Sequence, residues 1–272
     1  MNRNMEEIQV KKSIHKYAGQ SRCYYLGERD KNRFIYKYMD LEAAIVSLST
    51  DTIRFVEPLQ WEDRYEARFY NASYANVCNA AGNTPPLLAN CFSHEPMNEA
   101  AWKIYSHAKA GLGARCVKLK INKKAFRDMI VRMNADYRLY EGVVNYVEGY
   151  HIDNLHRRQY PNGRPNDLYD KVFSNFDLSS YLSLLLIKRP AFRHEQELRY
   201  FMIPKAPMLR GDIGSVNLQI NWKELLTGIS VDENCTDTEL EILNRILCSK
   251  GISISPKREF IYSMRDEFIT IE

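Results

Sequence analysis

Three charged side chains alternate along one short stretch of the sequence, Glu195, Glu197 and Arg199, just ahead of the apolar run 200–203 and Pro204. An aromatic and β-branched run that ends at a proline is typical of a buried strand. Because alternate residues of a strand point to the same side, we expect the three charges to share one face where the strand enters the core. Carboxylates there can hold a hydroxyl group, stabilise a developing cation or bind a metal, and the arginine can fix their orientation. The pattern is equally typical of a solvent-exposed edge strand with a local ion pair.

Aromatic side chains at two other places could bind a flat ring. Tyr36 and Tyr38 flank Lys37 in an apolar run, so a strand would show both rings on one face and the ammonium group on the other. Trp102 and Tyr105 lie three apart, on one face of a predicted helix. The four rings could stack on a base or a nicotinamide ring, with Lys37 near a phosphate or ribose group. Half-buried core tyrosines, a snorkelling lysine and ordinary core packing explain the same residues without a ligand.

The elements that must position these residues follow from the hydrophobic pattern. The pattern predicts strands over residues 34–38, 52–56, 90–93, 115–121, 143–147, 216–220, 228–231, 252–254 and 260–262. It predicts helices over residues 41–48, 98–109, 123–133, about 167–188 and 236–248. Asp40 and Asn122 are the expected N-caps of two of these helices. Lys118 and Lys120 alternate with apolar residues, which predicts that their strand is half exposed.

The order of these elements indicates the fold class. Several strands alternate polar with apolar residues, and the crossovers between strands are uneven in length. Both features favour a mixed, mostly antiparallel sheet with flanking helices, an α+β fold, over a doubly wound parallel one. Because no linker forces a domain boundary, we expect a polar N-terminal lead-in over residues 1–31 and a single α+β domain over residues 32–272.

Composition excludes several classes of protein. Of the 272 residues 45% are hydrophobic, so a sizeable core can form and wholesale disorder is excluded. The net charge of +4 permits an anionic ligand or nucleic acid without requiring one. The six cysteines include no Cys-x-x-Cys pair, which favours reduced thiols in the cytoplasm over disulfides or a zinc cage. We see no secretory signal or membrane-spanning run, and no glycine motif of dinucleotide-binding, phosphate-loop or α/β-hydrolase proteins.

Several segments occur together in the order of a known bacterial family. They resemble the domain-of-unknown-function family 2971, over roughly residues 33 to 203, through Tyr36-Lys37-Tyr38, the run from Trp61 to Glu66, Cys91-Phe92-Ser93, Trp102 with Tyr105 and Gly111, and Lys188 ahead of Glu195-Gln196-Glu197-Leu198-Arg199. Two features depart from the family pattern. The usual Asn-Asp-Pro stretch reads Glu62-Asp63-Arg64, and the tryptophan before the paired glutamates is Phe192.

The layout of that family is similar to the layout of ADP-ribosyltransferases. There, a first strand carries an aromatic and a cationic residue, a Ser or Tyr strand feeds an aromatic helix, and a late strand carries the catalytic glutamate. The matching residues here are Tyr36, Lys37 and Tyr38, then Ser93 with Trp102 and Tyr105, then Glu195 with Glu197.

The resemblance therefore implies ADP-ribosyl transfer from NAD. Glu197 would stabilise the ribose cation and Glu195 would position or deprotonate the acceptor, or the two roles could be exchanged. Arg199 would orient the pair. Lys37 would contact the ribose or pyrophosphate of NAD, and the four aromatic rings and Ser93 would complete the cofactor site.

Such an enzyme endangers its own cell, so we expect a cytoplasmic toxin or antiphage effector, held by a neutralising antitoxin protein and not associated with a membrane. The basic tract 115–138 and the run His156-Arg157-Arg158-Gln159-Tyr160 make DNA or RNA a candidate acceptor, beside protein side chains.

Two other classes of function remain open. One is a metal-dependent phosphodiesterase or nuclease that uses Asp63, Glu66, Glu195 and Glu197, with Lys188 near the phosphate. The other is a non-catalytic binding module whose aromatic cleft recognises a partner.

Overall fold

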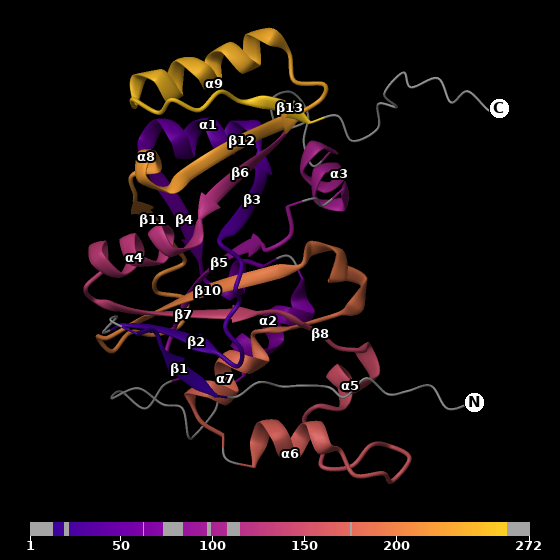
Figure 1. The fold of residues 1–272 in the computed structure, drawn as a ribbon. Helices are drawn as coiled ribbons and strands as arrows, with labels where there is room; N and C mark the ends of the chain where they lie inside the picture. The colour runs from indigo at the N-terminus through magenta and orange to yellow at the C-terminus, as the bar shows by residue number, and fades with distance from the viewer. Residues whose placement is uncertain are drawn as a thin grey trace, which may run out of the picture.

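The computed structural model describes residues 13–18, 22–61, 63–72, 84–96, 99–107, 115–174 and 176–259. In this part of the chain an eleven-stranded sheet runs in the order β1-β2-β7-β10-β5-β3-β6-β12-β13, and β4 and β11 branch from β5 (Figure 1). The strands are β1 (Ile14–Lys16), β2 (Cys23–Leu26), β3 (Phe34–Asp40), β4 (Thr52–Val56), β5 (Leu88–Ser93), β6 (Cys116–Asn122), β7 (Tyr137–Val143), β10 (Glu197–Pro204), β11 (Ser215–Gln219), β12 (Leu226–Asp232) and β13 (Lys257–Glu259).

The pairs β2–β7 and β12–β13 are parallel, and the other strand pairs described in this sheet are antiparallel. The short strands β8 (Asn145–Tyr146) and β9 (Ile187–Lys188) form a separate parallel pair. The expected α+β fold on a mixed, mostly antiparallel sheet is therefore confirmed.

Helices flank the sheet at both ends and along its sides. In Figure 1, α1, α8 and α9 lie beside β12 and β13 at the top, and α5 and α6 lie below β1 and β2. The helices are α1 (Leu41–Thr50), α2 (Arg64–Asn71), α3 (Glu99–His107), α4 (Lys123–Met133), α5 (Gly149–Asn154), α6 (Asp167–Phe173), α7 (Leu178–Leu184), α8 (Trp222–Leu225) and α9 (Asp237–Ser249), with the 3-10 helices η1 (Pro58–Gln60) and η3 (Pro190–Glu195). None of these helices is both long and apolar enough to cross a membrane.

Strand β5 is the branch point that brings the site strands together. Its first half pairs with β4, Ala89 opposite Val56, and its end pairs with β3, Ser93 opposite Tyr36. The other edge of β5 pairs with β10 along its whole length, which sets Glu197 opposite Ser93. The end of β5, the start of β10 and the middle of β3, from distant parts of the chain, thus meet at Ser93.

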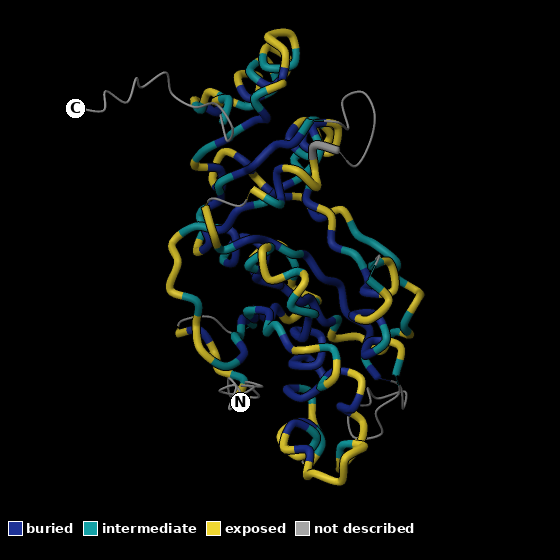
Figure 2. The backbone as a smooth tube through the Cα atoms, turned by 90° about the vertical axis from the view of Figure 1, so that its right-hand side faces the viewer, coloured by how far each residue is buried: buried dark blue, intermediate teal, exposed yellow. Residues whose placement is uncertain are grey.

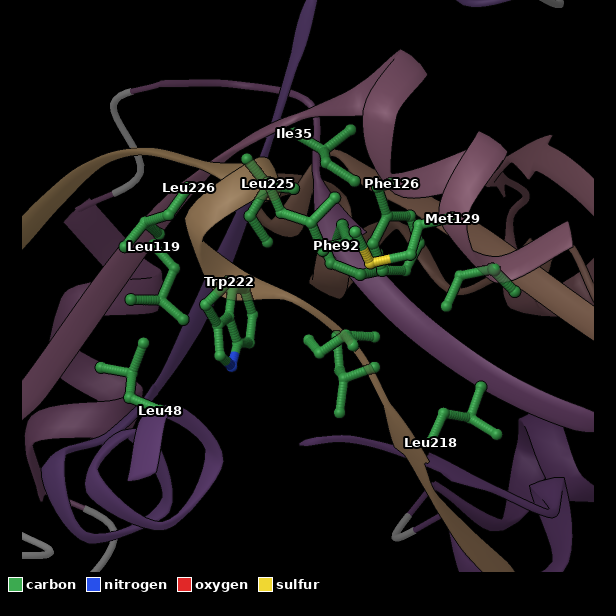
Figure 3. Close-up of a cluster of buried hydrophobic side chains, with 14 of the residues drawn as sticks. Ile35, Leu48, Phe92, Leu119, Phe126, Met129, Leu218, Trp222, Leu225 and Leu226 are labelled. Atoms are coloured by element: carbon green, nitrogen blue, oxygen red, sulfur yellow. The ribbon is translucent and has the colours of Figure 1, made fainter. Parts of the chain in front are cut away.

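Strand β10 is buried on both faces, which explains its unbroken apolar run. Leu198, Tyr200 and Met202 pack in a first core cluster, whereas Phe201 and Ile203 pack in a second one with residues of α2 and α7. The first cluster, around Trp222, Phe92 and Phe126, is drawn in Figure 3. Figure 2 shows the dark blue of buried residues concentrated in the central strands, with exposed residues on the peripheral helices and turns.

Many sequence expectations for individual elements hold. Asp40 and Asn122 do cap α1 and α4, since their side chains accept hydrogen bonds from the amides of Ala43 and Ala125. The predicted helix over residues 167–188 is wrong. Asp177 accepts a hydrogen bond from the amide of Ser180 and starts a second helix, so α6 and α7 are separate and the chain enters β9 before residue 188.

Other expectations need correction. The expected polar lead-in supplies β1 over residues 14–16 and β2 over residues 23–26, and Cys23 is fully buried. The strand that contains Lys118 is not half exposed, because β6 lies between β3 and β12 and α3 covers Lys118. The predicted strand 143–147 divides between the end of β7 and β8. Residues 252–254 form no strand, and the strand expected over 260–262 lies outside the described residues.

Candidate active site

An open cavity of about 370 Å³ lies where β3, β5 and β10 meet. It is lined by Tyr36, Tyr38, Trp61, Asp63, Glu66, Cys91, Phe92, Ser93, Ala101, Ile104, Tyr105, Lys188, Phe192, Glu195, Glu197 and Arg199. The lining residues come from the four strands β3, β5, β9 and β10, from α2 with the residues just ahead of it, from α3 and from η3. They include both glutamates and the arginine that the sequence singled out. The alternative of a solvated edge strand is wrong, because β10 lies inside the sheet.

Strand geometry places Glu197 and Arg199 on the cavity side of β10. Glu197 lies opposite Ser93 and Arg199 lies opposite Cys91, while Leu198 between them points into the first core cluster. Glu197 is 7% exposed and Arg199 is 1% exposed. The prediction that these two charges share one face of a strand is therefore confirmed.

Glu195 reaches the same cavity by a different route from the one expected. It is the last residue of η3 and not part of the strand. Gln196, at φ 44°, adopts the left-handed conformation and turns the chain into β10. The amide of His94 donates to the carbonyl of Gln196, at 2.9 Å, and holds this turn against the end of β5. The left-handed conformation of Gln196 thus allows Glu195, at the end of η3, and Glu197, at the start of β10, to point into the same cavity.

Two cations bind the carboxylates together at the base of the cavity. Lys188 Nζ lies 2.5 Å from Glu195 Oε2 and 3.4 Å from Glu197 Oε2. Arg199 donates to Glu197 Oε2 from Nε at 3.2 Å and from Nη2 at 2.6 Å. A third carboxylate, Glu66 on α2, pairs with Arg199 and, at 3.3 Å, with Lys188. Five mutually paired charges therefore form the base of the site.

The two glutamates titrate in opposite directions because their surroundings differ. Burial alone would raise the pKa of Glu197, but Arg199 and Lys188 outweigh burial and lower that pKa to about 2. Burial and the negative charge of Glu197 raise the pKa of Glu195, against the opposing effect of Lys188. Glu197 is therefore a fixed anion at neutral pH, and Glu195 is the more basic carboxylate of the pair.

Aromatic rings form the walls of the cavity. Trp61 covers Arg199, whose guanidinium carbon lies 4.4 Å from the ring centroid, and Phe192 lies 4.7 Å from Lys188 Nζ. Tyr36 and Tyr38 line the side formed by β3, as the sequence pattern predicted for their shared face. Tyr105, 39% exposed, lines the cavity from α3. The walls therefore offer several flat surfaces around an anionic base.

Two residues expected in the cofactor site do not line this cavity. Lys37 lies on the opposite face of β3 from the two tyrosines, and its Nζ donates to Asn90 Oδ1 and to the carbonyl of Cys91. Burial there lowers the pKa of Lys37. Trp102 is 2% exposed and packs edge-on against Tyr38, so it supports the cavity wall from behind. The structure thus gives both side chains structural contacts. The other four residues predicted for the cofactor site, Tyr36, Tyr38, Ser93 and Tyr105, line the cavity.

The four acidic residues of the metal hypothesis lie together at this cavity, but most of them pair with lysine and arginine side chains of the protein. Asp63, Glu66, Glu195 and Glu197 all line the cavity, but Lys188 and Arg199 stand between the last three. Within the described ranges no group of His, Cys, Asp or Glu residues is arranged to hold a metal ion. Asp63 instead caps α2 and pairs with Arg189 at 2.9 Å.

Sequence reasoning missed several lining residues. Cys91, Phe92, Phe192 and Trp61 entered only as parts of a family resemblance. The available signal was the position of each residue beside a strand end or helix start, which is where side chains from different elements converge.

Comparison with known proteins yields little. No family model matches the chain, and no curated protein matches it, so membership of family 2971 remains an expectation. Among solved structures, Thermus sp. 2.9 DarT in complex with NAD+ is 12% identical, at a TM-score of 0.36, over 85% of this chain and 96% of that one. The same protein in complex with ADP-ribosylated ssDNA gives 12% identity and a TM-score of 0.36, over 84% of this chain and 94% of that one. A similarity this weak does not assign an activity.

Proposed function

We propose that this protein is an ADP-ribosyltransferase that uses NAD, with Glu197 as the catalytic carboxylate. The observation that carries the proposal is the state of Glu197, a buried glutamate that two cations keep ionised at the base of an aromatic-walled cavity. The motif resemblance to ADP-ribosyltransferases supports the same assignment, because Glu195, Glu197, Ser93 and the two tyrosines of β3 meet in one place.

The cavity fits the part of NAD that reacts. Its volume of about 370 Å³ falls within the range of about 300–1,000 Å³ usual for small-molecule sites. That space suits a nicotinamide ring with its ribose, and the aromatic walls offer faces on which the ring can stack. NAD supplies a glycosidic bond whose cleavage places positive charge on the ribose.

Glu197 is suited to stabilise that charge. Its Oε2 is held by Arg199 and Lys188, so the carboxylate is fixed before substrate arrives and loses no energy in reorienting. A fixed anion beside the ribose stabilises the transition state, in which positive charge develops on the ribose, more strongly than the ground state, in which that charge lies on the nicotinamide ring; this difference is the requirement for raising kcat. The low pKa of Glu197, about 2, keeps this charge in place across the physiological range.

Glu195 is the better candidate for proton transfer. Its side chain is 26% exposed against 8% for Glu197, so an acceptor can reach it. Its raised pKa makes it the stronger base of the two. In the proposed step an acceptor oxygen or nitrogen bonds to the ribose carbon, the bond to nicotinamide breaks with its electron pair leaving on nicotinamide, and Glu195 takes the acceptor proton.

The acceptor we propose is nucleic acid, with a protein side chain as the alternative. The turn over residues 156–165 carries the exposed side chains of His156, Arg157, Arg158 and Arg164, which suit a phosphate backbone. DarT, the weakly similar protein above, is known in complex with ADP-ribosylated ssDNA. We further propose a toxin or antiphage effector of the cytoplasm, restrained by a neutralising protein, because uncontrolled transfer would harm the host.

The direct test is to incubate the protein with NAD labelled in the adenylate phosphate, together with DNA, RNA or cell lysate. We expect label to be transferred by the wild type and lost by about 100-fold or more in Glu197→Gln, which keeps the shape but removes the charge. Glu57→Gln is the matched control, since Glu57 is a 1% exposed carboxylate that does not line the cavity. Absence of transfer by the wild type, or full transfer by Glu197→Gln, would refute the proposal.

A further inference from the structure

Helix α2 is fastened to the segment that precedes the two glutamates. Asp63 and Glu66 lie three residues apart, on the same side of the helix start. They pair with consecutive residues of the segment, Asp63 with Arg189 and Glu66 with Lys188. These contacts therefore account for the positions of Asp63 and Glu66 without a metal.

Glu66 contacts both cations of the cluster, Lys188 and Arg199, and comes from a helix outside the segment that carries Glu195 and Glu197. Its Oε1 lies 3.3 Å from Lys188 Nζ, and its Oε2 contacts Arg199 Nη2. The same Nη2 lies 2.6 Å from Glu197 Oε2, and the same Nζ lies 2.5 Å from Glu195 Oε2. Each cation is thus held between Glu66 on one side and a glutamate of the proposed reaction on the other.

The contacts with Glu66, Glu195 and Glu197 determine the positions of the two cations. Lys188 is on β9 and Arg199 is on β10, and both side chains are at least nine-tenths buried. A buried cation moves toward whatever anions remain when one is removed, because an unpaired buried charge is costly. Without Glu66, both cations would be drawn wholly onto Glu195 and Glu197, and the two carboxylates would shift with them.

We propose that Glu66 is a positioning residue, which holds Lys188 and Arg199 from α2 so that these cations orient Glu195 and Glu197 for the reaction. The inference rests on the proposed function for its catalytic consequence, but the positioning itself can be measured without turnover. The competing explanation is that Glu66 only stabilises the fold as part of a buried ion network.

The variant Glu66→Gln separates the two explanations. We expect kcat for NAD cleavage to fall by roughly 10- to 100-fold, because small displacements of catalytic groups have effects of this size. KM for NAD should change far less than kcat, since Glu66 is only 6% exposed and acts through the two cations. The acid limb of the pH–rate profile should also move to lower pH. Glu195 acts deprotonated, and losing the nearby charge of Glu66 lowers its pKa.

Glu57→Gln is the control for loss of stability alone. Glu57 is as buried as Glu66, and its oxygens accept hydrogen bonds from Tyr70 Oη and from the amides of Gly211 and Gly214. We expect this variant to lower the melting temperature but to leave kcat and the pH profile as they are in the wild type. Glu66→Gln behaving in the same way as Glu57→Gln would overturn the proposal.

A measurement without NAD keeps this test independent of the proposed function. Carbon-13 NMR of glutamate-labelled protein, with Glu195→Gln to assign the resonance, reports the titration of Glu195 directly. We expect its midpoint to fall in Glu66→Gln and to stay constant in Glu57→Gln. A wild type that never cleaves NAD refutes the function, whereas an unmoved Glu195 titration in Glu66→Gln refutes the positioning.

Should Glu66→Gln fail to fold, Glu66→Asp replaces it. The shorter side chain keeps the charge but cannot reach both cations, so we expect kcat to fall while the acid limb stays in place. Wild-type kcat in Glu66→Asp would then overturn the inference.

Discussion

The depressed pKa of Glu197 makes the stability of this protein depend on pH in a way that can be calculated. A carboxylate whose folded pKa lies below its unfolded pKa stabilises the fold above the unfolded value, and that stability is lost as pH falls through the folded one. For Glu197 the two values are about 2 and 4.5. Each pKa unit corresponds to about 1.4 kcal/mol, so the full contribution of Glu197 to the free energy of unfolding is about 3 kcal/mol. Because the side chain is only 8% exposed, solvent screening removes little of it.

The assay is urea denaturation of the wild type and of Glu197→Gln at pH 7 and pH 3, followed by intrinsic fluorescence. Between these pH values the linkage relation gives a loss of about 2 kcal/mol in the wild type that the variant lacks. Glu195 acts in the opposite direction, because a group with a raised pKa stabilises the fold as pH falls. The loss of about 2 kcal/mol in the wild type is therefore an upper value. Glu195→Gln measures that opposing part separately.

A clear result would refute this reasoning. Were the wild type and Glu197→Gln to lose the same free energy of unfolding between pH 7 and pH 3, Glu197 could not be ionised by its paired cations. The electrostatic basis of the proposed mechanism would then fail with it.

Three further outcomes are expected. Lys37→Met should leave kcat for NAD cleavage unchanged and lower the urea midpoint, because Lys37 lies behind the cavity and its two hydrogen-bond acceptors lose their donor; a large fall in kcat would return Lys37 to the cofactor site. Chelation with EDTA should leave label transfer intact, since protein cations stand between the carboxylates; loss of activity that added magnesium restores would favour the nuclease instead. Gly142→Ala should lower the free energy of unfolding by about 1–3 kcal/mol, because the new methyl group would lie 2.3 Å from the buried Leu186 Cδ1. Gly149→Ala, with nothing within 4 Å, is its control and should unfold at the wild-type midpoint or slightly above it.

Local signals in the sequence predicted most of the elements. Capping by Asp40 and Asn122 depends on residues three positions away, so the helix starts could be identified without the fold. The alternation of Glu197 and Arg199 likewise needs only a strand, and β10 supplies it. The same logic failed between residues 167 and 188, because a continuous apolar stripe conceals the break at Asp177 that starts a second helix.

The sequence by itself therefore determined a mixed α+β fold and the strand face that carries Glu197 and Arg199. Only the tertiary structure decided what surrounds them. Strand order placed β3 and β10 on either side of β5, and packing of α2 brought Glu66 onto Lys188 and Arg199 from more than a hundred residues away in the chain. Because the cavity lies on one side of β3, Tyr36 and Tyr38 line it and Lys37 does not. The reason is physical, since local periodicity fixes which side chains share a face, whereas the pairing of distant strands fixes what that face meets.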